Sequence, residues 1–196
     1  MKAPSPRPRL RLLLLLVGLL AASCVSAGGD TKRVSFNGGW RRYTGEGWGG
    51  LDEQNTFGLT NAIEKPGSLA GIDFGFLWAE DSGMLQGRRI ALDSYEAYGG
   101  IMKSLAVVPD RLRAEFGCGT SGTFVYGQDR NGLPGSRYDE GWFLSAYARV
   151  NLEFRVGGPL WFGLEARAVR GGSATVHGND LEGDYDQLAF QLSLAR

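Results

Sequence analysis

A long alternation of apolar and polar residues from Trp142 to Val156 constrains the fold more than any other feature of this chain. Every second residue is apolar, and the positions between carry mostly polar or charged side chains. A period of two residues indicates a β-strand with one apolar and one polar face. After the turn at Gly157-Gly158-Pro159, the segment from Leu160 to Arg170 repeats the pattern. The two segments predict a β-hairpin whose arms exceed the usual strand length of about 5–6 residues.

The same alternation recurs along the rest of the chain and predicts eight strands. Their ranges are 33–43, 55–64, 68–79, 88–103, 111–126, 142–156, 160–170 and 185–196. In the fourth strand the apolar phase changes near Ser94, and we expect a β-bulge there. Long polar loops, at 44–54, 80–87, 127–141 and 171–184, alternate with short turns, and strands of about 9–11 residues suit a tilted bilayer crossing. The pattern predicts an all-β fold, one eight-stranded antiparallel up-and-down β-barrel of the transmembrane type.

The two faces of the strands carry different side chains. The polar face holds arginines and glutamates that can neutralise one another inside a narrow barrel: Arg113, Glu115, Arg149, Glu153, Arg155, Glu165 and Arg167. The apolar face holds aromatic residues at the strand ends nearest the long loops, as in an aromatic girdle at one membrane interface: Trp40, Phe57, Trp78, Tyr126 and Trp142. Side chains fill the interior of an eight-stranded barrel, so we expect a lumen ion-pair network and no large pore.

A soluble eight-stranded barrel with the two faces exchanged is the alternative architecture. Its apolar face would line a lipid-binding cavity and its Arg/Glu face would meet water, as in lipocalins. Such a protein would be periplasmic or secreted. Alternation alone fits both architectures, whereas the loop asymmetry and the aromatic residues at one rim favour the membrane barrel.

The first 27 residues have the composition of a secretory signal peptide. Basic residues come first: Lys2, Arg7, Arg9 and Arg11. An apolar run at 12–22 follows, which is too short to span a bilayer as a helix, and then come small residues up to Ala27. Cleavage there leaves a barrel domain at 28–196, while the alternative is a lipoprotein with Cys24 as its lipidated N-terminus. Without Cys24, Cys118 has no intramolecular disulfide partner.

The last two predicted strands carry the strongest resemblance to a known group. Leu160–Arg170 reads LWFGLEARAVR and Asp184–Leu194 reads DYDQLAFQLSL. In strand pattern, the chain from about residue 33 resembles the small outer-membrane β-barrel proteins of Gram-negative bacteria, the group like the outer membrane protein A barrel. This resemblance implies contact with outer-membrane lipid and lipopolysaccharide and insertion by the barrel assembly machinery. Such barrels usually end in an aromatic residue, whereas this sequence ends in Leu194-Ala195-Arg196.

Catalytic and metal-binding patterns are weak. Some barrels of this group modify lipid A with a His-Ser-Asn set, but the one histidine here, His177, lies in a polar loop with Ser173 and Asp180 nearby in sequence. The same loop carries Asp180, Glu182, Asp184 and Asp186 without a calcium-loop signature, so a solvated acidic loop is the better interpretation. We expect no enzyme activity, no cofactor and no metal site.

Charge gives no reason to propose a nucleic-acid partner, because residues 28–196 carry 17 basic and 21 acidic side chains. The sequence therefore predicts an outer-membrane barrel with a structural or surface-interaction role, whose loop ligand is unknown. A lipocalin-like lipid carrier and a lipid A-modifying enzyme are the alternatives.

Overall fold

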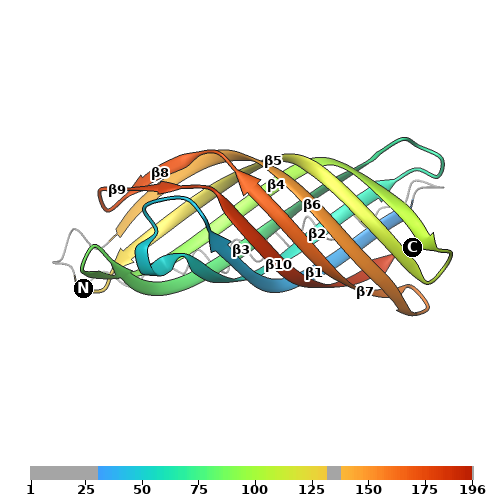
Figure 1. The fold of residues 1–196 in the computed structure, drawn as a ribbon, viewed down its shortest axis with the longest axis horizontal. Coiled ribbons are helices and arrows are strands. Elements are labelled where there is room, and N and C mark those ends of the chain that lie inside the picture. Colours follow the sequence, from blue (N-terminus) through green and yellow to red (C-terminus); the bar gives the residue numbers. More distant parts are fainter. Residues whose placement is uncertain (1–30, 132–137, 196) are drawn as a thin grey trace, which may run out of the picture. The chain divides into compact units, whose positions relative to one another are not determined.

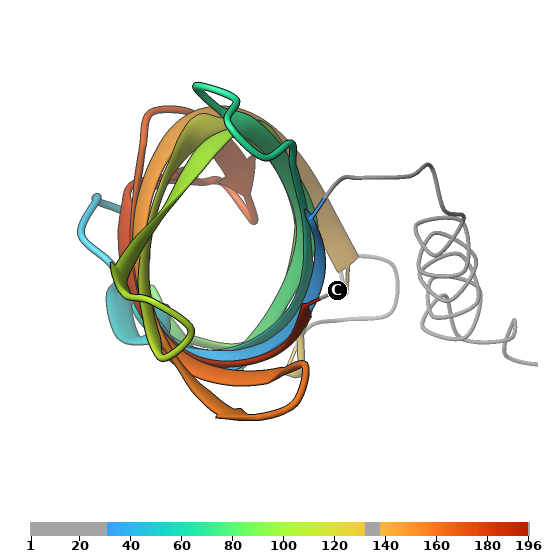
Figure 2. The ribbon, with the colours of Figure 1, turned by 90° about the vertical axis from the view of Figure 1, so that its right-hand side faces the viewer.

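Eight strands of the computed structural model close into one antiparallel barrel within the described residues, which are 31–131 and 138–195 (Figure 1). In chain order they are β1 (Thr31–Tyr43), β2 (Glu53–Glu64), β3 (Gly71–Leu85), β4 (Arg88–Val108), β5 (Leu112–Asp129), β6 (Tyr138–Gly157), β7 (Leu160–Arg170) and β10 (Tyr185–Ala195). Each strand pairs with the next in this order, and β10 pairs with β1 to close the ring in Figure 2. The predicted eight-stranded barrel is confirmed.

The two ends of the barrel differ. At the turn end, short connections at 65–70, 109–111 and 158–159 join the strands. At the loop end lie the 3-10 helix η1 (Gly49–Leu51) and a separate hairpin of β8 (Ser173–Val176) and β9 (Asn179–Glu182). No helix within the described ranges is both long and apolar enough to cross a membrane. The predicted signal peptide at 1–27, with Cys24, lies outside the described residues.

The apolar face of every long strand points outward, away from the lumen. Along β6, Trp142, Leu144 and Val150 are exposed, whereas the alternate residues from Phe143 to Glu153 are buried. A sheet that closes on itself with this register must place one complete face inside, and here that is the polar face. The lipocalin-like alternative, with an apolar interior and a charged exterior, is therefore wrong.

Several strands run further toward the loop end than predicted. β3 and β4 pair from end to end up to a turn at Gln86-Gly87, where a loop at 80–87 was expected. β5 and β6 likewise extend into the predicted loop at 127–141, and the predicted loop at 171–184 contains the β8–β9 hairpin. Outside a bilayer the outward face can be polar, so these extensions lack the alternation by which strands are recognised in a sequence.

The expected β-bulge near Ser94 is wrong. β4 keeps an unbroken register past Ser94 with both β3 and β5. The apolar phase changes because Ile90 and Leu92 point inward with Ser94, into an apolar cluster at the loop end. Within the described strands, register shifts occur instead between Ala106 and Val108 and between Arg155 and Gly157, both near the turn end.

Candidate functional site

A network of charged side chains occupies the lumen. Among the described residues it joins five arginines to five carboxylates: Arg33, Arg41, Arg113, Arg149, Arg167, Asp73, Glu96, Glu115, Glu153 and Glu165. All are buried except Arg113, which is nearly so. Because a buried charge needs a partner of opposite sign, equal numbers of each sign are what a closed lumen requires.

Arg149 is the centre of the network. Its guanidinium lies 2.8 Å from an Asp73 carboxylate oxygen, 2.5 Å from Glu115 and 3.2 Å from Glu165. The Tyr147 hydroxyl donates a hydrogen bond to the second oxygen of Asp73 at 3.0 Å. Since these residues come from β3, β5, β6 and β7, one arginine connects four strands of the barrel.

The turn-end part of the network contains two neighbouring arginines. Arg33 on β1 pairs with Glu115 and lies 3.6 Å from Glu153, and Arg113 on β5 donates to the same Glu153 carboxylate. The Arg113 guanidinium also lies 4.2 Å from the ring centre of Trp161, which points into this end of the lumen. Each arginine therefore has a carboxylate partner, and Arg113 also packs against an aromatic ring.

The loop-end part combines two arginines with tyrosine rings. The Glu96 carboxylate on β4 forms ion pairs with Arg41 at 3.5 Å and Arg167 at 3.4 Å. It also accepts a hydrogen bond from the Tyr185 hydroxyl. The Arg167 guanidinium lies 3.8 Å from the ring centre of Tyr98. The Tyr147 ring lies 4.3 Å from the same guanidinium, so aromatic faces lie beside the charged groups in this part of the lumen.

The structure places six of the seven predicted lumen residues in this network and excludes Arg155. The Arg155 guanidinium donates to the Gly158 carbonyl at 2.7 Å and lies 3.9 Å from exposed Asp110, at the rim of the turn end. Its direct cross-strand partner is inward-facing Trp161, so Arg155 keeps the lumen phase, but it lies beyond Glu153 at the open rim, where its side chain is exposed. Sequence reasoning missed Arg33, Arg41, Asp73 and Glu96, although the first three occupy the polar phase of their strands.

Toward the loop end the interior changes from polar to apolar. A cluster that we call the cap fills the mouth of the barrel; its members from the connecting segments are Trp48, Leu51, Ala174, Val176 and Leu181. The Trp48 ring stacks on Tyr43 at 3.4 Å, and its indole N–H donates to the Glu182 carbonyl at 2.6 Å. The β8–β9 hairpin packs against Gly127 and Gly141, where an added Cβ would lie 2.8 Å from Val176 or Ala174. The connecting segments therefore pack onto the strands at the loop end of the barrel.

The five predicted girdle residues lie on the outward face of their strands. Trp40, Phe57 and Trp142 are largely exposed, and Trp78 and Tyr126 are half-buried. The rings of Phe57 and Trp78 are neighbours, with centres 6.0 Å apart. Their place at a membrane interface stays a prediction.

The candidate catalytic and calcium-binding residues are engaged in other contacts. The His177 amide donates to Asp139 at 2.6 Å, and its Nε2 lies 3.2 Å from the Gly127 carbonyl. The carboxylate contact is thus made by the backbone amide, and the imidazole meets a backbone carbonyl. The acidic residues of this region point to separate partners, as Asp186 pairs with Arg170 at 2.6 Å and Asp180 accepts from Thr175. No group of three possible metal ligands occurs among the described residues.

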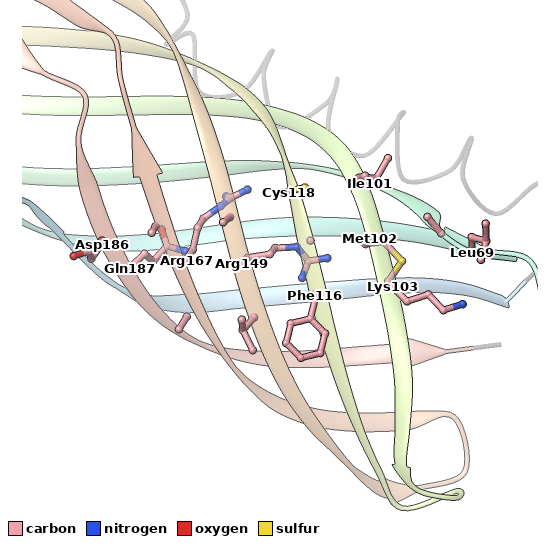
Figure 3. A pocket seen from close by; sticks show the side chains of 16 residues that line it. Leu69, Ile101, Met102, Lys103, Phe116, Cys118, Arg149, Arg167, Asp186 and Gln187 are labelled. Atoms are coloured by element: carbon pink, nitrogen blue, oxygen red, sulfur yellow. The ribbon is translucent and has the colours of Figure 1, made fainter.

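Described residues line hollows at the turn end and along the outer wall of the barrel. One of about 300 Å³ opens at the turn end beside Arg33, Arg113 and Trp161. The other, in Figure 3, runs along the outer face of β4 to β7 and has mainly apolar lining, including exposed Phe116 and Cys118. An outward-facing apolar hollow at this place is suited to contact with lipid chains.

Comparison with known proteins identifies the fold. No family model and no curated protein matches the sequence. The barrel is similar to the solved structure of Neisserial surface protein A, with a TM-score of 0.59 and 7% identity over 87% of this chain and 99% of that chain. Its fold is that of the small outer-membrane β-barrels.

Two further barrels of this group superpose on the chain. They are a major outer membrane protein from Thermus thermophilus, with a TM-score of 0.57 and 11% identity over 85% of this chain and 99% of that one, and OprG from Pseudomonas aeruginosa, with 0.54 and 11% over 85% and 96%. At these identities the similarity concerns architecture, and the role must be argued from the residues of this chain.

Proposed function

We propose that the protein is a transmembrane β-barrel of a bacterial outer membrane, with a structural or surface-interaction role and no large pore. The lumen charges hold the barrel together, and the loop end meets the exterior. In this proposal, surrounding lipid and lipopolysaccharide contact the outer face, and the barrel assembly machinery inserts the chain.

The observation that supports this proposal is the inverted polarity of the barrel. Large apolar side chains such as Phe36, Leu152 and Phe190 are about half exposed on the outside, while Arg149 and Glu153 are buried inside. In water this arrangement would expose a large apolar surface and bury ten charges, whereas in a bilayer the outer face is solvated by acyl chains. Neutral pairing within the lumen, and the cap above it, favour a filled barrel over a conducting one.

Cell fractionation with a heat-modifiability gel tests the location. We expect the protein in the outer-membrane fraction, with an unboiled band that migrates differently from the boiled one. Planar-bilayer recordings test the second part, and we expect no steady conductance of the porin type. A soluble periplasmic protein without a gel shift would contradict the location, and a stable large conductance would contradict the filled lumen.

A further inference from the structure

An aromatic patch covers the outer face of β5 and β6 near the loop end, and consists of Tyr126, Tyr138 and Trp142. All three point outward, and the rings of Tyr126 and Tyr138 stack with centres 5.6 Å apart. Tyr138 is 58% exposed and Trp142 67%. Exposed aromatic surface of this kind marks a contact with a membrane or a partner.

The patch lies higher on the barrel than the other outward aromatic residues. Cross-strand partners form a ladder from β2 to β6: Phe57, Trp78, Tyr95, Phe124 and Trp142. From β3 toward β10, each cross-strand partner lies nearer the loop end than the one before. The row of partners that starts at Ile72, beside the turn end of β3, reaches Asp186 at the loop end of β10. With strands about 4.8 Å apart and tilted by about 40°, Trp142 lies roughly 12 Å above Phe57.

On the adjoining wall, formed by β7 and β10, the outward face becomes charged at a lower level. Arg170 ends β7 and forms an ion pair with Asp186, and both side chains are about half exposed. The β6 partner of Arg170 is Ala146, four residues after Trp142 on the turn-end side. Four residues along a tilted strand span a height of about 10 Å, and the step from Ala146 on β6 to Arg170 on β7 rises by about 3 Å. Trp142 therefore lies roughly 7 Å above Arg170. Because a charged pair belongs outside the hydrocarbon, the patch lies above the hydrocarbon edge.

Polar side chains lie beside Tyr126 and Tyr138 and, further toward the loop end, at the adjoining ends of β4 and β5. They are two carboxylates, an amide and two guanidiniums: Asp93, Glu140, Gln128, Arg89 and Arg130. The two carboxylates are the cross-strand partners of Tyr126, one on each side, and the amide lies 3.5 Å from the Tyr138 hydroxyl. Sugar rings present C–H groups to aromatic faces and hydroxyls that both donate and accept hydrogen bonds. This composition suits a saccharide, because sugar hydroxyls can hydrogen-bond to such groups and the C–H bonds of an acyl chain cannot.

We propose that the aromatic patch binds the saccharide headgroup of a glycolipid in the outer leaflet. The patch faces sideways from the barrel wall above the hydrocarbon edge, with Trp142 lowest and Tyr138 roughly 10 Å nearer the loop end along β6. A neighbouring glycolipid presents its sugars at that level while its acyl chains cover the apolar face below. This proposal rests on the outer-membrane location and adds a partner and its contact residues.

The test uses the chain reconstituted in phosphatidylcholine vesicles alone, with lipid A, or with lipopolysaccharide that carries its core saccharide. The emission of the unchanged protein minus that of Trp142→Phe isolates the signal of Trp142. We expect lipopolysaccharide to shift this signal and lipid A to leave it unchanged. Tyr138→Ala is expected to raise the lipopolysaccharide concentration needed for the half-maximal shift about tenfold. Trp40→Phe is the matched control, because exposed Trp40 lies lower on the apolar face and should respond equally to both glycolipids.

Quenching by brominated acyl chains separates the possible failures. Trp142 quenched as strongly as Trp40 would place the patch in hydrocarbon and overturn the proposal. An equal response of Trp142 to lipid A and lipopolysaccharide would also overturn the proposal. So would a Trp142 signal that depends on the protein-to-lipid ratio, because that indicates contact with a second copy of the chain. Absence of quenching at Trp40 would instead contradict the membrane location on which the proposal rests.

Discussion

Replacing Arg149 by methionine should destabilise the barrel more than any other single change of charge in the lumen. Arg149→Met keeps most of the side-chain volume but leaves Asp73, Glu115 and Glu165 without their shared cation. Breaking a buried ion pair by removing one partner costs about 3–5 kcal/mol of unfolding free energy. Glu115 keeps Arg33 and Asp73 keeps the Tyr147 hydroxyl, so we expect about 3–4 kcal/mol.

Urea unfolding of the refolded protein in lipid vesicles, followed by the gel shift of the folded band, measures this loss. With a slope of about 2 kcal/mol per molar urea, the midpoint should fall by roughly 1.5–2 M. Adding Asp73→Asn and Glu165→Gln removes two unpaired charges and should restore about half of the loss. The matched control is Arg155→Met at the exposed rim, expected within about 0.5 kcal/mol of the unchanged protein. Equal midpoints for Arg149→Met and Arg155→Met would refute the argument that the lumen charges hold the barrel together.

Three further changes probe the cap, the lumen packing and the outer face. Trp48→Ala removes a buried ring from the cap and should cost about 3–5 kcal/mol while making residues 44–52 sensitive to added protease; unchanged protease resistance would contradict the cap. Gly100→Ala places a Cβ 2.5 Å from the Tyr147 hydroxyl and should lower the urea midpoint by the equivalent of about 1–3 kcal/mol. Outward-facing Gly122→Ala is the control and should have little effect. A larger loss of stability for Gly122→Ala than for Gly100→Ala would contradict the packing described for the lumen. In a Cys24→Ser protein in vesicles, Cys118 should resist a water-soluble maleimide while the barrel is folded and react after unfolding. Rapid labelling of the folded protein would show that the outer face around Cys118 is not covered by lipid.

The barrel itself could be predicted because its physical cause is local. A strand that separates lipid from a polar lumen must alternate, and the residues from Trp142 to Arg170 show this without reference to any other part of the chain. The strands near the loop end could not be delimited in the same way, because outside the bilayer their outward face is free to be polar. The apparent break at Ser94 arises on the inner face instead, since Ile90 and Leu92 face an apolar cap where the rest of β4 faces a polar lumen.

The lumen network was predictable in kind and only partly in membership. Residues such as Arg149 and Glu165 stand in a clean alternation, so their inward direction follows from the sequence. Which acid meets which arginine depends on the register between strands that are far apart in sequence, as with Asp73 and Arg149. Arg155 has the correct phase for the lumen but lies at the exposed rim of the turn end, and the alternation alone does not mark where along the strand the lumen network stops.

Spin labels placed one at a time along β6 would test the inverted polarity most directly. Single cysteines at Ala148, Val150 and Leu152 sample the outward face, and Ser145 and Asn151 sample the lumen face. In bilayers, we predict strong relaxation by lipid-soluble oxygen at the three outward positions and weak relaxation at the two inward ones. The opposite alternation, or outward positions that respond mainly to a water-soluble nickel complex, would contradict a barrel with its apolar face in lipid.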